Sequence, residues 1–182
     1  LGNNENNVIY GHDSGNTILA QDGNDFVYGG ANGDTLNGDS GHDFIHGGGG
    51  DDIINGGTGN DDINGGTGND VIWGGTGDDT INAGAGNDTV FISSGHDSVT
   101  LGDGADTIAV DPTYLTPGSD SSMTVTDFNV GEGDQLDLSN LNGAVAEITS
   151  GSTSDDLVLT IADANHAGNS ITITLEGVLP AS

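Results

Sequence analysis

The 182-residue sequence contains no lysine, arginine or cysteine, and only 4% of its residues are aromatic. Proteins neutralise nucleic-acid phosphates with basic side chains, so the lack of Lys and Arg argues against nucleic acid as a partner. The same lack disfavours acidic membrane headgroups and acidic polysaccharides. Without cysteine, neither disulfides nor thiolate metal sites contribute. No stretch approaches the roughly 20 apolar residues that span a bilayer, so no membrane insertion is expected.

The composition is strongly acidic. Twenty-nine Asp and Glu residues and five His give a formal net charge of −29, and 32% of the residues are hydrophobic. A chain with so much like charge and so little apolar surface does not normally offset the conformational entropy lost on folding. An ordered form therefore needs another source of stability. Calcium is the natural candidate, because it prefers carboxylate and backbone carbonyl oxygens.

Residues 2–109 form twelve consecutive units of nine residues without insertion or deletion. The best copies, such as GGTGNDVIW over residues 65–73, match the pattern GGxGxDxUx, in which a glycine-rich turn binds calcium and a three-residue strand follows. The sixth position is Asn7, Asn16, Asp25, Asp34, Asp43, Asp52, Asp61, Asp70, Asp79, Asp88, Asp97 and Asp106. The eighth is Ile9, Ile18, Val27, Leu36, Ile45, Ile54, Ile63, Ile72, Ile81, Val90, Val99 and Ile108.

Each unit predicts half of a coil. Glycine at positions 1, 2 and 4 permits positive φ and a sharp turn. Positions 7–9 predict a short strand whose middle residue, the aliphatic one, points inward. Two units then make one coil, so residues 1–109 predict an all-β fold, a right-handed parallel β-roll solenoid of six coils. Its core of aliphatic side chains is thin, and we do not expect it to hold the roll together alone.

The predicted coil places aspartates from alternate units in two columns, with Asp25 under Asp43 and Asp34 under Asp52. Ten aspartates in two columns give eight adjacent pairs (10 − 2 = 8). Carboxylates stacked about 5 Å apart repel each other, which favours a bound cation over a simple turn-capping role. We therefore expect up to about eight calcium ions. Their 16 positive charges would reduce the net charge from −29 to −13.

These repeats resemble the RTX (repeats-in-toxin) family of proteins exported by type I secretion systems. The resemblance implies that each calcium is held by the carbonyls of positions 2 and 4 and the aspartate of one turn. The facing turn adds the carbonyls of positions 1 and 3 and its own aspartate. For one site this implies Gly57, Gly59, Asp61, Gly74, Thr76 and Asp79. Besides the ten aspartates, the metal ligands implied are Gly48, Gly50, Gly56, Gly57, Thr58, Gly59, Gly65, Gly66, Thr67, Gly68, Gly74, Gly75, Thr76, Gly77, Ala83, Gly84, Ala85 and Gly86.

Four units depart from the pattern. The first two carry asparagine at position 6, with Glu5 and Ser14 at position 4. The last two carry Ile92 and Leu101 at position 1. The calcium sites expected from the sequence therefore lie mainly in the central units.

The nine-residue period ends at Ala109, and Pro112 and Pro117 then indicate a linker. Strands are predicted over residues 123–128, 136–138, 157–161 and 171–175. Because a solenoid needs an atypical terminal unit, residues 110–182 are expected to form a C-terminal β cap. Residues 126–141 resemble the DF…GxDxLDLSxL signature that follows the repeats in type I-secreted adhesins, serralysin proteases and alginate epimerase modules. That resemblance implies an uncleaved secretion signal in this region.

No enzymatic site is predicted, because the sequence contains neither an HExxH nor a GxSxG motif. The histidines are His12, His42, His46, His96 and His166. The resemblance implies a calcium-binding module at the C-terminal end of a type I-secreted bacterial surface adhesin or exoprotein. Such a module would stay unfolded at cytosolic calcium concentrations and fold outside the cell. The expected partners are calcium, the secretion machinery and preceding domains of a longer parent chain, and the module is expected to be a monomer.

Two alternatives remain. The chain could be the C-terminal module of a secreted protease or epimerase, and sequence upstream of Leu1 would decide this. An ice-binding face, suggested by Thr58-Gly-Asn60 and Thr67-Gly-Asn69, is disfavoured because no ladder of Thr and Asn runs along one column of turns.

Outward positions 7 and 9 carry two groups of aromatic residues. Tyr10, Phe26 and Tyr28 lie in the early units, and Trp73 and Phe91 in the later ones. We expect residues 110–182 to fold back over Trp73, and a preceding domain to cover the first group. The alternative is that both groups form simple ladders across neighbouring strands.

Overall fold

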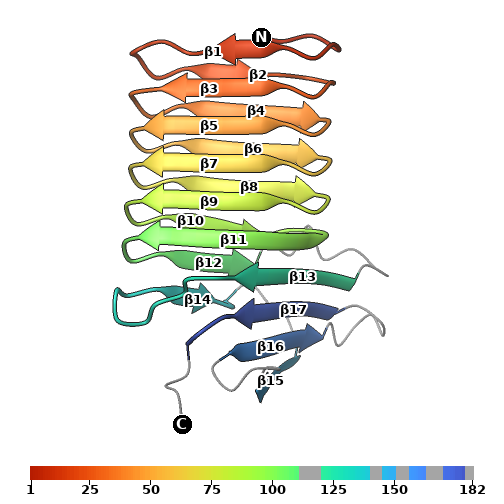
Figure 1. The fold of residues 1–182 in the computed structure, drawn as a ribbon, viewed down its shortest axis with the longest axis vertical. Coiled ribbons are helices and arrows are strands. Elements are labelled where there is room, and N and C mark those ends of the chain that lie inside the picture. The colour runs from red at the N-terminus through yellow and green to blue at the C-terminus, as the bar shows by residue number, and fades with distance from the viewer. Residues whose placement is uncertain (111–119, 140–144, 151–155, 163–169, 179–182) are drawn as a thin grey trace.

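The computed structural model describes residues 1–110, 120–139, 145–150, 156–162 and 170–178. Within these residues every regular element is a β-strand, and the strands stack into a solenoid of about six turns (Figure 1). The described residues contain no helix that is long and apolar enough to cross a membrane. The predicted all-β solenoid is therefore confirmed.

Two sheets run along the solenoid. One contains, in spatial order, β1 (Val8–Tyr10), β3 (Phe26–Gly30), β5 (Phe44–Gly49), β7 (Asp62–Thr67), β9 (Thr80–Ala85), β11 (His96–Asp103), β13 (Asp120–Val125), β17 (Ser170–Leu175), β16 (Leu157–Ala162) and β15 (Val145–Ser150). The other contains β2 (Thr17–Leu19), β4 (Thr35–Ser40), β6 (Ile53–Thr58), β8 (Val71–Thr76), β10 (Thr89–Ile92), β12 (Thr107–Val110) and β14 (Gln135–Asp137).

Strands from β1 to β12 pair in parallel with a constant offset of two repeats. Ile45 pairs with Ile63 in one sheet, and Ile54 pairs with Ile72 in the other. Because side chains alternate along a strand, this register stacks the residues at repeat position 8 on one another between the two sheets. Two repeats therefore make one coil, as the sequence predicts.

The central strands are longer than the three residues predicted. Strand β6 is six residues long, from position 7 of one repeat to position 3 of the next. Its register with β8 skips position 1, between the pairs Asn55–Trp73 and Gly57–Gly75. The glycines continue the extended chain past the strand positions, so the turn begins later than expected.

Glycine has different roles at the different repeat positions. Positions 2 and 4 adopt positive φ, as at Gly57 (113°) and Gly59 (123°), and Asp39 adopts it at position 2 without being glycine. Position 1, by contrast, is not among the residues with positive φ. At Gly56 a Cβ would stand under 3.0 Å from the carbonyl oxygen of Gly74 and from Asp61 Oδ2. Close packing, and not the turn conformation, therefore explains glycine at position 1.

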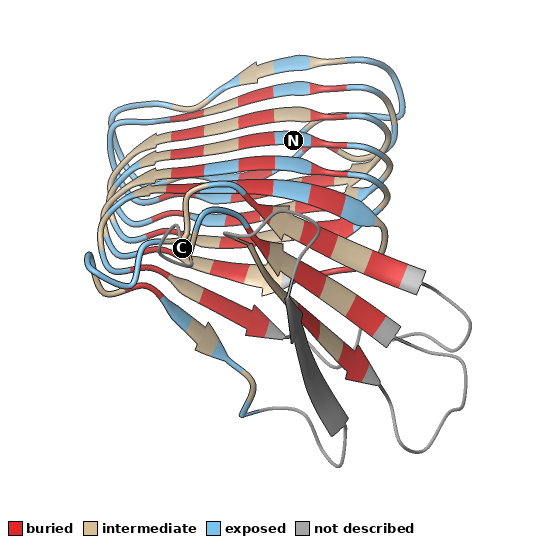
Figure 2. Cartoon of the chain, turned by 60° about the horizontal axis from the view of Figure 1, so that its bottom comes forward, coloured by how far each residue is buried: buried red, intermediate tan, exposed pale blue. Residues whose placement is uncertain are grey.

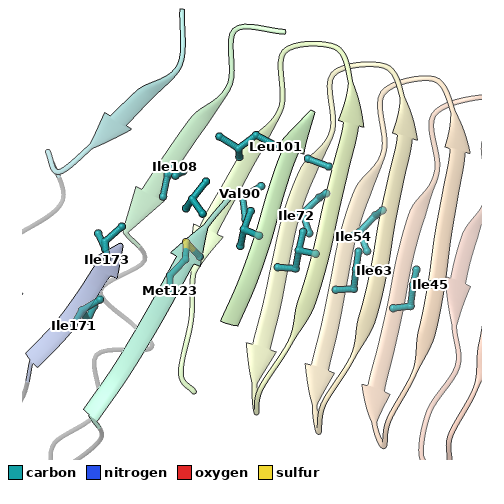
Figure 3. Close-up of a cluster of buried hydrophobic side chains, with 14 of the residues drawn as sticks. Ile45, Ile54, Ile63, Ile72, Val90, Leu101, Ile108, Met123, Ile171 and Ile173 are labelled. Atoms are coloured by element: carbon teal, nitrogen blue, oxygen red, sulfur yellow. The ribbon is translucent and has the colours of Figure 1, made fainter. Parts of the chain in front are cut away.

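The aliphatic residues of position 8 form the core between the sheets (Figure 3). Eleven of the twelve are buried, and Ile9 in the first coil is partly buried. The core also includes Leu101, at position 1 of the last repeat, and it continues beyond the repeats through Met123, Ile171 and Ile173. The twelve residues predicted are therefore only part of it.

The C-terminal segment extends both sheets. Strand β13 pairs in parallel with β11, and β14 pairs in parallel with β12. Strand β17 then pairs in parallel with β13, while β16 and β15 add antiparallel strands at the end of the stack (Figure 2). The domain boundary proposed after Ala109 therefore marks the end of the nine-residue period, whereas both sheets continue past it.

Four of the C-terminal strands lie close to their predicted positions, with boundaries that differ by at most three residues. Strand β15 was not predicted from the sequence. Its sequence, VAEITS, lacks a strong alternation of apolar and polar residues. The strand pairs with β16, and this contact cannot be read from the sequence of β15 alone.

The aromatic residues form ladders across neighbouring strands. Trp73 stacks on Phe91 with ring centroids 4.6 Å apart, and Tyr10 stacks on Tyr28 at 4.9 Å. The described strands of the C-terminal segment continue the stack beyond β11 and β12, and they do not fold back over β8, the strand that carries Trp73 (Figure 1). For these residues the expected fold-back is wrong, and the cross-strand ladder is what the structure contains.

The two neighbouring isoleucines of β6 give a matched test of the core. Ile54 is fully buried, whereas Ile53 is 49% exposed on the outer face. Replacing Ile54 by Ala should lower the free energy of unfolding by about 2–5 kcal/mol, because it leaves a cavity in the core. Ile53→Ala should change it by less than about 1 kcal/mol. Urea unfolding at saturating calcium measures both, and equal losses would contradict the inward direction of position 8.

Candidate metal sites

Turns eighteen residues apart stack in two columns, and a hydrogen-bond ladder joins their aspartates. The ten sixth-position aspartates are at most 3% exposed. The backbone N–H of Asp61 donates to Asp79 Oδ1 at 2.9 Å, and that of Asp70 donates to Asp88 Oδ1 at 2.8 Å. The same bond recurs between every pair of stacked sixth-position residues, from Asn7–Asp25 to Asp88–Asp106. The predicted stacking of the aspartates is therefore present.

The second carboxylate oxygen of nine of the ten sixth-position aspartates has no hydrogen-bond partner. Among the described residues, nine sixth-position Oδ2 atoms are buried and unpartnered. A buried polar atom without a partner is costly, and a buried anion more so. The affected residues are Asp25, Asp34, Asp43, Asp52, Asp61, Asp70, Asp79, Asp88 and Asp106.

Backbone carbonyls from both turns face the gap between stacked turns, as the gap between turns 56–61 and 74–79 illustrates. The oxygens of Gly57 and Gly59 lie against the glycines two repeats later, under 3.0 Å from where their Cβ atoms would be. From the later turn, the oxygen of Gly74 lies close to Gly56 in the same way, and Thr76 O accepts the N–H of Gly59 at 2.7 Å. Carbonyls of positions 2 and 4 thus point forward, and those of positions 1 and 3 point back.

These oxygens suit a hard cation. The described residues bring together no group of three or more His, Cys, Asp or Glu side chains that could hold a metal. Each gap instead offers two aspartates and backbone carbonyls, the oxygen-only environment that calcium prefers over softer metals. The remaining implied carbonyl ligands lie in the equivalent turns 47–52, 56–61, 65–70, 74–79 and 83–88.

Burial makes the charged form of these carboxylates unfavourable when no cation is present. Burial, with a smaller contribution from the nearby carboxylates of Asp97 and Asp61, raises the pKa of Asp79 from 3.8 to about 8. The N–H bond from Asp61 opposes the shift. For the same main reason the pKa of Asp52 rises to about 7, and those of Asp43 and Asp88 to about 6. Without a cation, burial therefore shifts these carboxylates towards their protonated form.

The first turn of each column is closed by an asparagine amide. Asn16 Nδ2 donates to His12 O at 3.0 Å, to Asp34 Oδ1 at 2.9 Å, and to Ser14 O. These acceptors are the carbonyls of positions 2 and 4 and the facing aspartate, the groups that surround the other gaps. Asn7 Nδ2 likewise donates to Glu5 O at 2.5 Å. The asparagines at position 6 of the first two repeats therefore provide hydrogen-bond donors that the aspartates of the other turns lack.

One column also ends in a hydrogen bond. The Oδ2 atom of Asp97, the last aspartate of that column, accepts the hydroxyl of Ser93 at 3.2 Å. Ser93 follows Ile92, in a unit that departs from the repeat. Asp97 is thus the sixth-position aspartate whose Oδ2 is satisfied by the protein.

A second ladder at position 5 was not recognised from the sequence. Side-chain acceptors there take the backbone N–H two repeats later, as Asn24 Oδ1 does from His42 N at 3.0 Å. His42 Nδ1 in turn accepts from Asn60 N at 2.9 Å. Asn, Asp and His at position 5 are the signal for this ladder. It gives His42 a structural role, while His166 lies outside the described residues.

The raised pKa values predict how pH affects the roll without calcium. Because the folded state binds protons that the unfolded chain does not, stability should rise as pH falls from about 8 towards 3.8, with no further gain below. Far-UV circular dichroism in metal-free buffer tests this. The variant Asp79→Asn should show a smaller rise, because it lacks the carboxyl whose pKa reaches about 8. Folding that does not change over this range would contradict the prediction.

The arrangement of the columns predicts that replacing different aspartates weakens calcium-dependent folding to different extents. Asp70 faces Asp88 through its unpartnered Oδ2 and bonds Asp52 N through Oδ1, so Asp70→Ala damages two gaps. Asp25 faces only Asp43 in this way, because its other neighbour is Asn7. Calcium titrations should therefore show a larger shift of the folding midpoint for Asp70→Ala than for Asp25→Ala. Equal shifts would contradict the stacking.

Comparisons with known proteins agree with the repeat geometry. Residues 1–36, 28–63, 56–90 and 93–111 match four copies of the family model for the RTX calcium-binding nonapeptide repeat. No curated protein matches the chain.

Solved structures that match include the AlgE6R3 subunit from the Azotobacter vinelandii mannuronan C5-epimerase, with 19% identity and a TM-score of 0.36 over 97% of this chain and 74% of that chain. The extracellular lipase LipA from Serratia marcescens matches with 18% identity and a TM-score of 0.29 over 88% of this chain. The match covers 38% of the lipase chain.

RTX repeats are typical of secreted bacterial proteins, and the calcium-binding roll that they form is a structural module, generally non-catalytic. The four matched segments together cover more than half of the sequence. The chain therefore belongs to the RTX calcium-binding nonapeptide repeat family.

Proposed function

We propose that this chain is a calcium-driven folding and export module of a type I-secreted bacterial surface adhesin or exoprotein. The observation that supports this most directly is the set of nine buried, unpartnered aspartate oxygens. The chain has no Lys or Arg to neutralise them. A cation from the solvent is then the partner that makes the folded state favourable.

The calcium ions occupy the gaps between stacked turns. In each gap the earlier turn supplies its Asp Oδ2 and the carbonyls of positions 2 and 4. The later turn supplies its Asp Oδ1 and the carbonyls of positions 1 and 3. For the gap described above, these are Gly57, Gly59 and Asp61 with Gly74, Thr76 and Asp79. The eight gaps between repeat aspartates then hold eight ions and reduce the net charge of −29 to −13.

Calcium binding and folding are one event in this proposal. The unfolded chain does not bring two turns together, so calcium binds mainly the folded roll and stabilises it. Each site adds about 2.7 kcal/mol when free calcium is 100 times its dissociation constant. Extracellular calcium modules bind at roughly 10⁻⁴–10⁻³ M, far above cytosolic calcium. The chain therefore stays unfolded in the cytosol, passes through the type I channel and folds outside.

The parent protein determines what the folded module serves. In an adhesin it stabilises the C-terminal end of a chain whose preceding domains bind a surface. In the alternative, a secreted protease or epimerase, it stabilises the chain beside a catalytic domain. In both cases the module itself is a non-catalytic monomer. Sequence preceding Leu1 distinguishes the two, because an HExxH domain there would indicate a protease.

The proposal predicts a coil-to-β transition driven by calcium. Far-UV circular dichroism should show an unfolded chain in EGTA at pH 7.5 and a β spectrum in millimolar CaCl₂. Magnesium should substitute poorly, because it demands tighter octahedral geometry and loses its water reluctantly. Sodium chloride at matched ionic strength controls for charge screening. A folded spectrum in EGTA, or equal folding in sodium chloride, would contradict the mechanism.

A further inference from the structure

The turn at residues 129–134 extends one column of aspartates beyond the repeats. Strand β14 pairs with β12 so that Leu136 stands beside Ile108, in the same way that Ile108 stands beside Val90. Asp134, which precedes β14, therefore follows Asp106 in the column. The backbone N–H of Asp106 donates to Asp134 Oδ1 at 3.0 Å. This is the bond that joins all the repeat aspartates, although 28 residues separate this pair instead of 18.

The unpartnered oxygens distinguish this end of the column from the other ends. In each of the eight gaps between repeat aspartates, the earlier residue has a buried Oδ2 without a partner. The ninth such atom is Asp106 Oδ2, whose neighbour further along the column is Asp134. Asp97 ends the other column, and there Ser93 satisfies Oδ2. Asp106 Oδ2 is thus buried without a partner, although no further repeat faces it.

The facing turn is acidic and fixed in place. Asp134 is 6% exposed, and its Oδ2 accepts the N–H of Asn129 at 2.8 Å. Gly133 lies over Ala105, with 3.0 Å between the alanine Cβ and the position of a glycine Cβ. Asp127 adds a third carboxylate near this end, where it accepts the N–H groups of Leu101 and Gly102, both at 2.8 Å. No Lys or Arg exists in the chain to neutralise these charges.

We propose that the gap between turns 101–106 and 129–134 is a ninth calcium site. Asp106 and Asp134 supply carboxylate oxygens, and Gly102 and Gly104 supply the carbonyls that positions 2 and 4 supply elsewhere. Both glycines have positive φ, 96° and 152°, like their counterparts in the other turns. The site rests on the proposed calcium binding of the roll, and it ties the C-terminal segment to the repeats through a shared ion.

This site gives the C-terminal segment its own dependence on calcium. Asp134 precedes β14, whose first N–H, that of Gln135, donates to Asp106 O at 2.8 Å. An ion between the two turns would therefore hold β14 against β12. The segment NVGEGDQLD at residues 129–137 is then a degenerate thirteenth repeat, with Asp134 at position 6 and Leu136 at position 8.

Counting bound calcium by native mass spectrometry tests the site. The wild-type chain should bind one ion more than Asp134→Asn, because Asp134 takes part in no other gap. Glu132→Gln is the matched control, since it removes one charge from the same turn at an exposed residue. It should bind as many ions as the wild type. The ninth site is overturned if Asp134→Asn binds as many ions as the wild type.

A second variant guards against misfolding of the turn. In Asp106→Asn the amide can donate to the carbonyls of its own turn, as Asn16 does, while its oxygen still accepts the N–H of Asp88. It should bind at least one ion fewer, because Asp106 lines both this gap and the gap with Asp88, and it should keep a β spectrum in calcium. If wild type and both variants bind the same number of ions, the ninth site fails and the proposed function stands. If the wild type binds no calcium, the proposed function itself fails.

Discussion

The fold depends on carboxylate oxygens that it buries and does not satisfy. Each stacked aspartate uses Oδ1 to hold the N–H of the preceding turn, which fixes the carboxylate in the column. The same placement leaves Oδ2 buried without a donor. In a chain without Lys or Arg, that charge must be neutralised by a proton or by a cation from the solvent. The raised pKa values of Asp79 and Asp52 describe the first option, and calcium is the second.

The rest of the architecture follows from this constraint. Within the repeats the core is mainly one aliphatic residue per repeat, because most of the other positions form turns or closely packed stretches of glycine. Such a core stabilises neighbouring coils only weakly, and in the proposed function the calcium ions between turns join each coil to the next. At the ends the requirement is relieved by local donors, the amides of Asn7 and Asn16 and the hydroxyl of Ser93. These residues, which depart from the repeat pattern, thus satisfy buried oxygens at the ends of the columns.

Much of this arrangement could be predicted from the sequence, because a strict period fixes both the register and the inward residue. The aspartate columns and the aliphatic core follow from that period alone. The long strands could not be predicted, since glycine is read as a turn residue although Gly56 and Gly57 continue β6. Neither could the place of Asp134 be found, because an insertion breaks the period and only the pairing of β14 with β12 restores the column. The roles of Asn16 and Ser93 depend on side-chain contacts, which a repeat pattern does not contain.

The dependence of stability on free calcium tests the central claim most directly. Urea unfolding at a series of buffered calcium concentrations gives the number of ions released when the chain unfolds, from the slope of ln K against ln[Ca²⁺]. If the buried oxygens and the ions form one cooperative unit, stability should rise by about 1.4 kcal/mol per site for each tenfold increase in free calcium. The slope should then correspond to about eight ions or more. A slope near zero would show that the roll folds without its ions, and it would contradict the account.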